Sequence, residues 1–134
     1  MPVIFVARSA KLSRWGSDVG LGKHVYKVGV TEDDPKAAAS AGWAGETDWS
    51  VVKTEPIEEI EESAAIVRLA AKEKMIEPRL YPKLKGTTGV FRLTEARVEN
   101  HILVSRALAG DSDKTAFKLK PADFAAYLIH NARR

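Results

Sequence analysis

The chain has 134 residues, of which 45% are hydrophobic and 29% are charged, so we expect a globular domain and not a disordered chain. It contains no cysteine, which excludes a disulfide framework and thiolate metal sites, and no apolar run approaches the ~20 residues of a membrane span. The formal net charge of +3 permits a nucleic-acid partner without requiring one, and the absence of a signal-peptide pattern favours a cytoplasmic protein.

Two strands and a capped helix are predicted in the first third of the chain. The runs at 2–8 and 24–31 are rich in the β-branched and aromatic residues that strands favour. The segment between the two runs contains several glycines and serines, so we expect it to be a long loop. Asp34 and Pro35 suit the N-cap and the first position of a helix, and Gly42 suits its C-cap.

The rest of the chain predicts two further strands and three further helices. Apolar spacing favours a helix over 57–77, which Pro78 would end because the residue before a proline is disfavoured in the α conformation. Thr94 suits the N-cap of a later helix. In chain order, the expected elements are a strand at 49–54, the helix at 57–77, a loop at 79–88, a strand at 89–93, a helix at 95–108, a turn at 110–113, a short extended piece around Phe117 and Leu119, and a helix from Pro121.

These elements place the chain in the α+β class. We expect a small three- or four-stranded, mostly antiparallel sheet with helices packed on it, followed by two C-terminal helices. The chain is interpreted as one domain over residues 1–134, with a core at 1–93 and a helical extension at 94–134.

Charge is distributed unevenly along the chain. Five glutamates lie between residues 55 and 62, as is typical of a helix N-terminus, where carboxylates complement the helix dipole. Residues 68–97 carry three acidic side chains and eight basic ones. The basic residues are Arg68, Lys72, Lys74, Arg79, Lys83, Lys85, Arg92 and Arg97. A stretch of this density is either a solvated face or a phosphate-binding one.

The expected loop between the first two strands combines positive charge with an aromatic residue. Arg8, Lys11 and Arg14 precede Trp15, so this segment could pair with phosphates and stack on a base. The alternative is an insertion whose Trp15 folds back onto the body of the protein.

Several motifs follow one another in an order that is known from other proteins. Val3-Ile4-Phe5 runs on into Arg8-Ser9, and Lys27-Val28-Gly29 runs on into Asp34-Pro35. Further along, Glu73 precedes a Leu-Tyr-Pro exit at 80–82. This order of motifs, over about residues 2–93, resembles the GIY-YIG endonuclease superfamily.

The resemblance implies a metal-dependent nuclease site, of which this chain keeps only part. The metal-binding glutamate of the family corresponds to Glu73, which would hold Mg²⁺ if the protein is an active nuclease. The first tyrosine of the family corresponds to Phe5, and its second corresponds to Lys27, with Tyr26 one residue earlier. The arginine of the family falls on an alanine. The candidate catalytic residues are therefore Glu73, Tyr26 and Lys27.

Three functions follow from these observations and stay open at this stage. The first is a divergent GIY-YIG-like domain that binds DNA or RNA without efficient cleavage. The second is an active Mg²⁺-dependent endonuclease that holds the metal with Glu73. Its base would be Tyr26 or His24, and its phosphate contact would be Lys27 or Arg8. The third is a protein-interaction module with no nucleic-acid role. The expected nucleic-acid contacts are Arg8, Lys11, Arg14, Lys27, Arg79, Lys83 and Lys85.

Overall fold

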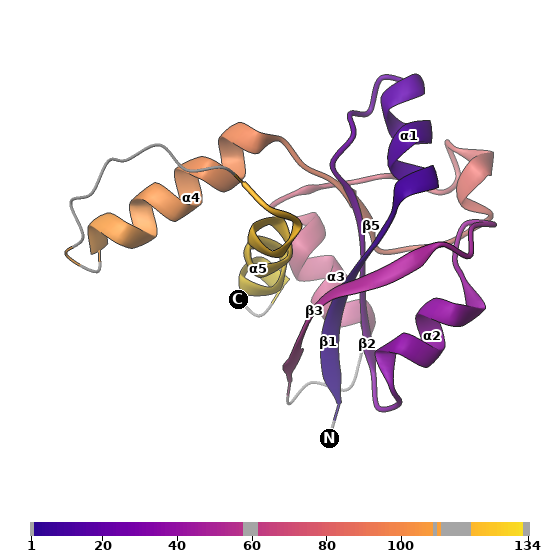
Figure 1. Cartoon of the computed structure of the whole chain (residues 1–134), viewed down its shortest axis with the longest axis horizontal. Coiled ribbons are helices and arrows are strands. Elements are labelled where there is room, and N and C mark those ends of the chain that lie inside the picture. The colour runs from indigo at the N-terminus through magenta and orange to yellow at the C-terminus, as the bar shows by residue number, and fades with distance from the viewer. Residues whose placement is uncertain (1, 58–61, 109, 111–118, 133–134) are drawn as a thin grey trace.

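The computed structural model describes residues 2–57, 62–108, 110 and 119–132 (Figure 1). Within these residues, five strands form one antiparallel sheet in the order β3-β1-β2-β5-β4. The strands are β1 (Val3–Ser9), β2 (Val25–Thr31), β3 (Trp49–Pro56), β4 (Lys74–Met75) and β5 (Val90–Arg92). The helices are α1 (Ala10–Asp18), α2 (Pro35–Ala41), α3 (Glu62–Ala70), α4 (Glu95–Leu108) and α5 (Pro121–Ala132), together with a 3-10 helix, η1 (Pro82–Leu84). The α+β class, with helices packed on the sheet and two C-terminal helices, is confirmed.

Strand β1 lies between β2 and β3, and its register assigns each side chain to one face of the sheet. Phe5 is opposite Gly29 of β2, and Val6 is opposite Val28. Because successive side chains of a strand point to opposite faces, Ile4 and Val6 point to one face and Phe5 points to the other. Each face carries its own hydrophobic core.

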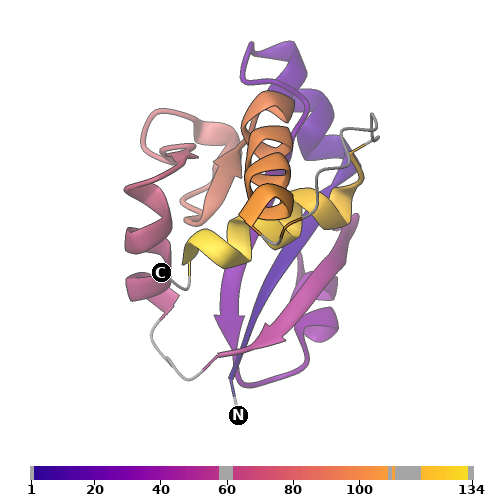
Figure 2. The same ribbon diagram turned by 90° about the vertical axis from the view of Figure 1, so that its left-hand side faces the viewer.

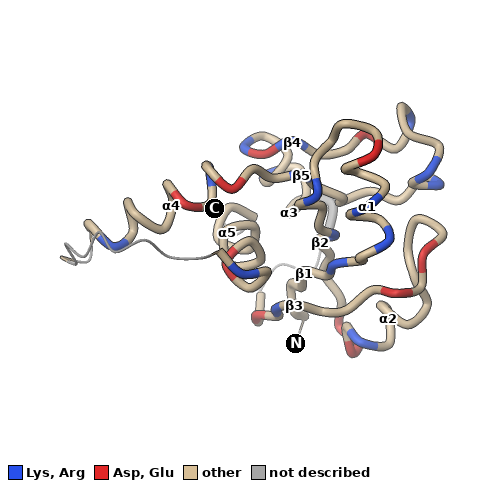
Figure 3. The backbone as a smooth tube through the Cα atoms, turned by 45° about the horizontal axis from the view of Figure 1, so that its top comes forward, with Lys and Arg blue, Asp and Glu red and all other residues tan. Residues whose placement is uncertain are grey.

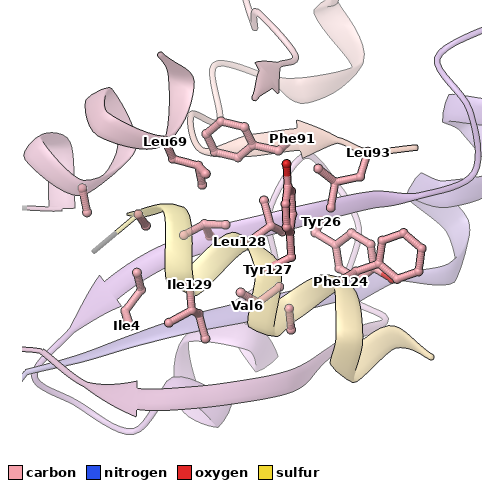
Figure 4. Packing of buried hydrophobic residues seen from close by; sticks show 14 of the residues in the cluster. Ile4, Val6, Tyr26, Leu69, Phe91, Leu93, Phe124, Tyr127, Leu128 and Ile129 are labelled. Carbon is pink, nitrogen blue, oxygen red and sulfur yellow. The ribbon is translucent and has the colours of Figure 1, made fainter. Parts of the chain in front are cut away.

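The face of Ile4 and Val6, called the α5 face below, is covered by α3 and α5. Phe124, Leu128 and Ile129 of α5 are buried there, and Figure 4 shows them directly above the strands. Figure 2 shows α5 lying across the sheet, with α4 in front of it. Helix α4 then extends away from the body of the protein (Figure 1).

The face of Phe5, called the α2 face below, is covered by α1, α2 and aromatic side chains of the segment after α2. The ring of Trp43 stacks on Phe5 with centroids 5.7 Å apart, and Trp49 meets Trp43 edge-on at 5.3 Å. Burying these large rings supplies much of the apolar area on this side of the sheet.

Most of the predicted elements are confirmed. Helix α2 begins as expected, because the side chain of Asp34 accepts a hydrogen bond from the Lys36 amide at 3.0 Å. Helix α4 has the predicted bounds, and the strands at 2–8, 24–31, 49–54 and 89–93 are present with small shifts. Most of the predicted turn at 110–113, and Phe117, lie outside the described residues. Among the described residues, no helix is long and apolar enough to cross a membrane.

The predicted loop between β1 and β2 is wrong, because most of it forms α1. The side chain of Ser9 caps this helix by accepting a hydrogen bond from the Leu12 amide at 3.1 Å. Gly16 misled the prediction, since it serves close packing and not flexibility. A Cβ atom there would lie 2.7 Å from the carbonyl oxygen of Gly22 and 2.9 Å from the side chain of Val25.

The predicted end of the helix at 57–77 is also wrong, because α3 ends at Ala70. The chain then turns, and Lys74–Met75 pairs with β5 as the fifth strand, one more than expected. The amide of Ile76 continues this pairing by donating to the carbonyl oxygen of Val90 at 2.8 Å. Pairing with a distant strand therefore overrides the helical spacing of the sequence, and Pro78 does not end the helix.

Candidate functional site

The candidate catalytic residues Tyr26 and Lys27 point to opposite faces of the sheet. Tyr26 lies on the α5 face, where its ring stacks on Phe124 with centroids 5.5 Å apart. His24, the alternative base, stacks on the same ring at 4.4 Å and bonds to Glu95 at 3.0 Å. Burial raises the pKa of Tyr26 to about 12, although the positive charge of Arg8 acts in the other direction. A hydroxyl with this pKa is poorly suited to accept or relay a proton near neutral pH.

Lys27 is buried on the α2 face and is only 4% exposed. Its Nζ donates a hydrogen bond to the carbonyl oxygen of Val28 at 3.1 Å and lies 5.7 Å from the centre of the Trp43 ring. The ammonium group therefore interacts with the protein interior, and a phosphate could reach it only after the surrounding aromatic side chains had moved.

Glu73, the candidate metal ligand, lies in the turn between α3 and β4 and is surrounded by protein partners. Its Oε1 atom accepts hydrogen bonds from the Tyr127 hydroxyl and from Nε of Arg97, the latter at 3.1 Å. The Nη2 atom of Arg97 lies 3.0 Å from the same oxygen and also donates to the carbonyl oxygen of Lys72 at 3.2 Å. The Glu73 side chain is 2% exposed. Because its partners lie on α4 and α5, this buried carboxylate joins both helices to the edge of the sheet.

Glu73, Arg97 and Tyr127 are bonded to one another, and these bonds change the pKa values of two of the three groups. Burial, and then the neighbouring Glu73 carboxylate, raise the pKa of Tyr127. The Tyr127 side chain, and then Glu73, raise the pKa of Arg97. The arrangement does not fit a magnesium site, because Mg²⁺ binds a carboxylate that is open to a hydrated ion, and here Arg97 occupies that position. In the described part of the chain, no group of three or more His, Cys, Asp or Glu residues is placed to hold a metal.

Unlike the candidate catalytic residues, two segments of the expected nucleic-acid contacts, α1 and residues 79–85, lie side by side in the fold. The ring of Trp15 on α1 meets Tyr81 edge-on, with centroids 5.8 Å apart. This contact places α1 beside the segment at 79–85. Figure 3 shows lysine and arginine positions along α1 and in the neighbouring segment. Trp15 therefore folds back onto the protein, as the alternative interpretation held.

We call the surface formed by these two segments the basic patch. Its residues are Lys11, Arg14, Trp15, Arg79, Tyr81, Lys83 and Lys85. Lys11, Arg14, Arg79 and Lys85 are exposed. Lys83 pairs with Glu46, and Arg79 lies 3.4 Å from Glu77. Arg8 is exposed at the end of β1, where its charge acts on Tyr26 of the α5 face, and Lys27 is buried, so neither belongs to the patch.

The position of α1 is fixed by a small polar network at its first turn. The Ser9 hydroxyl donates to a carboxylate oxygen of Asp48, and the amide of Lys11 donates to the other oxygen at 3.0 Å. Burial acts to raise the pKa of Asp48, but the hydrogen bonds from Ser9 and Lys11 together lower it. The loop before β3 thereby holds the helix that carries half of the basic patch.

The partners of Glu73 were not predicted from the sequence. Arg97 and Tyr127 lie on α4 and α5, far from Glu73 along the chain. No local spacing connects the three residues, and only the packing of both helices against the sheet edge brings them together. The one signal in the sequence was the density of basic residues over 68–97, which includes Arg97.

The comparisons with known proteins add no identification. No protein-family model, no curated protein and no solved structure matches this chain.

Proposed function

We propose that this chain is a nucleic-acid-binding module of GIY-YIG-like architecture that does not cleave its ligand efficiently, and that the basic patch is its contact surface. The observation that carries the proposal is the contact between Trp15 and Tyr81, which joins two basic segments from distant parts of the chain. The family part of the proposal is supported by the order of β1, β2 and α2. We expect the chain to act in the cytoplasm.

The chemistry of the patch suits phosphates. Lys11, Arg14 and Lys85 are exposed cations that can each neutralise a phosphate and release a counterion. Trp15 and Tyr81 are half-buried, so part of each aromatic side chain is exposed and could contact a base. Of the acidic side chains nearby, Glu46 pairs with Lys83 and Asp48 accepts from the Lys11 amide, so they reduce the positive charge without removing it.

The non-cleaving part of the proposal is supported by the separation of the candidate catalytic groups. The Tyr26 hydroxyl has a raised pKa, Lys27 faces the protein interior, and Glu73 is bonded to Arg97 and Tyr127. A phosphodiester could not contact all three groups at once, since Lys27 lies on the opposite face of the sheet from the other two. Fast hydrolysis needs those groups around one phosphate.

The test is a fluorescence-anisotropy titration with labelled single- and double-stranded DNA and RNA at two salt concentrations, each with and without Mg²⁺. We expect binding that weakens with salt, and intact nucleic acid afterwards. The double variant Lys11→Gln/Arg14→Gln should bind more weakly and reduce the salt slope by about two for double-stranded DNA. Lys36→Gln is the control for the loss of one charge outside the patch, because Lys36 is an exposed lysine on α2, which lies at the bottom of Figure 1 while α1 lies at the top.

The other outcomes separate the remaining functions. Product that forms only with Mg²⁺ would overturn the non-cleaving proposal in favour of an active nuclease. No binding to any of the four nucleic acids would overturn it in favour of a protein-interaction module. A loss of binding free energy in Lys36→Gln that is half of the loss in the double variant, as one charge against two requires, would show that net charge, and not the basic patch, attracts the ligand.

A further inference from the structure

Two like charges face each other where β4 pairs with β5. Lys74 and Arg92 are directly opposite in the register of this strand pair. Side chains at opposite positions point to the same face, and like charges in such a pair destabilise the sheet. Within the described residues, neither side chain forms an ion pair or a side-chain hydrogen bond. An anion between the two cations would relieve this repulsion.

A cavity of about 220 Å³ opens at this position. Its polar lining includes Lys72, Lys74, Arg92, Arg97 and Thr94, with Leu21 among the apolar residues. The carboxylate of Glu73 also lines it, but that charge is already paired with Arg97. Because Arg97 compensates Glu73, the net positive charge of the cavity lining comes from three further cationic residues, Lys72, Lys74 and Arg92.

Two of these cations are held in place by the fold. Arg97 is fixed through Nε and Nη2 by Glu73 and by the carbonyl oxygen of Lys72. Lys72 donates from Nζ to the carbonyl oxygen of Asn131 at 3.0 Å. Of the two, Arg97 is held by groups that line the cavity, so it loses little side-chain freedom when it meets an anion, and a guanidinium matches the geometry of a phosphate. Glu95, the nearest further carboxylate along the chain, is bonded to His24.

We propose that this cavity binds the phosphate group of a phosphomonoester. The volume is smaller than the ~300–1,000 Å³ of pockets that enclose drug-sized ligands, so it suits a phosphate group and not a whole nucleotide. Two sources carry this chemistry: a small phosphorylated molecule, or the terminal phosphate of a nucleic-acid strand. The site is separate from the basic patch, whose residues do not line the cavity.

The first experiment is thermal unfolding of the full chain in inorganic phosphate and in chloride at equal ionic strength. A ligand that binds only the folded state raises the Tm as its concentration increases. We expect this rise in the wild type, in Lys36→Gln and in Lys11→Gln/Arg14→Gln. The Arg92→Gln variant should bind phosphate about tenfold or more weakly, because it loses a charged hydrogen-bond donor. The Lys74→Gln variant should lose the phosphate response and also melt at a higher temperature than the wild type in chloride, since it removes the like-charge pair.

An equal phosphate response in all five proteins would overturn the proposal, and so would the absence of any response in the wild type. The second experiment identifies the source by comparing oligonucleotides that differ only in a 5′-phosphate. Tighter binding of the phosphorylated strand by the wild type, but not by Arg92→Gln, assigns the site to strand ends. Equal binding of the two strands, with the phosphate response intact, assigns it to a small phosphorylated molecule. Since inorganic phosphate is the first probe, this experiment tests the phosphate site independently of the proposal that the basic patch binds nucleic acid.

Discussion

The carboxylate of Glu73 lies 3.0 Å from a guanidinium nitrogen of Arg97, with the Glu73 side chain 2% exposed and the Arg97 side chain 57% exposed. The buried Glu73 carboxylate therefore needs Arg97 to compensate its charge, whereas water solvates much of the Arg97 side chain. Together with the hydrogen bond from Tyr127, the pair ties α4 and α5 to the edge of the sheet.

Replacing Glu73 tests this structural role. We expect Glu73→Gln to lower the free energy of unfolding by about 1–3 kcal/mol, because it leaves the network without its charge while solvent around Arg97 limits the loss. Urea denaturation measures the change. Glu95→Gln, which alters an exposed carboxylate paired with His24, should change stability by no more than about 0.5 kcal/mol. Equal stability of Glu73→Gln and the wild type would contradict the role.

The two buried tyrosines predict an alkaline limit of stability. The pKa of Tyr26 rises from 10.0 to about 12 on folding, and the pKa of Tyr127 is also raised. The unfolded chain therefore releases these protons first, so the contribution is fully present below pH 10 and is lost as the pH rises toward 12. Stability measured by denaturation across this range should fall, and Tyr26→Phe should make the fall less steep. An unchanged slope in that variant would remove Tyr26 as a cause.

The network at the start of α1 predicts a separate effect at acid pH. Although burial acts to raise it, the hydrogen bonds from Ser9 and Lys11 lower the pKa of Asp48 in the folded protein. Its contribution to stability is therefore present above the usual pKa of a carboxyl group and is lost as the pH falls through the folded pKa. Asp48→Asn should lower stability at neutral pH and flatten this part of the acid titration. Ser9→Ala should cost about 0.5–2 kcal/mol through loss of the N-cap. If α1 retains its amide protection from hydrogen exchange in both variants, the anchor is not needed.

Gly89 allows β5 to approach β2 closely. Its φ is +79°, and a Cβ atom there would lie 2.6 Å from the carbonyl oxygen of Val28. Gly89→Ala should therefore cost the ~1–3 kcal/mol of a strained backbone and a further amount for the contact. Gly86→Ala is the matched control, because Gly86 has the same φ with nothing within 4 Å of the added atom. Thermal or urea unfolding of the two variants separates the steric cost from the backbone cost, and equal losses would contradict the close approach.

Local patterns account for the parts of the fold that the sequence predicted well. The caps at Asp34 and Thr94 and the proline at 121 mark helix starts through interactions within a few residues. The β-branched runs of β1 and β2 are long enough to identify strands without knowledge of their partners. In each case, the signal and the structure that it produces lie in the same stretch of chain.

The features that were missed depend on distant partners. Gly16 appears flexible in the sequence and becomes a packing residue only when Val25 lies against it. Lys74 and Met75 are strand residues only because β5 is beside them. For the same reason, the partners of Glu73 and the cavity at Arg92 could not be derived from spacing. Charge alone selected the five cationic residues of the basic patch, but it also selected Arg8 and Lys27, which lie elsewhere.

The central position of β1 also bears on how the chain folds during synthesis. Strands β1, β2 and β3 can pair as soon as residue 56 has emerged, because β1 lies between β2 and β3 and both of its partners are in the first part of the chain. Helix α5, which buries Phe124, Leu128 and Ile129 over these strands, is made more than sixty residues later. The nascent sheet must therefore expose the part of its apolar face that α5 covers throughout that interval. We expect ribosome-bound chains that stop before α5 to bind chaperones, and full-length chains to be released from them.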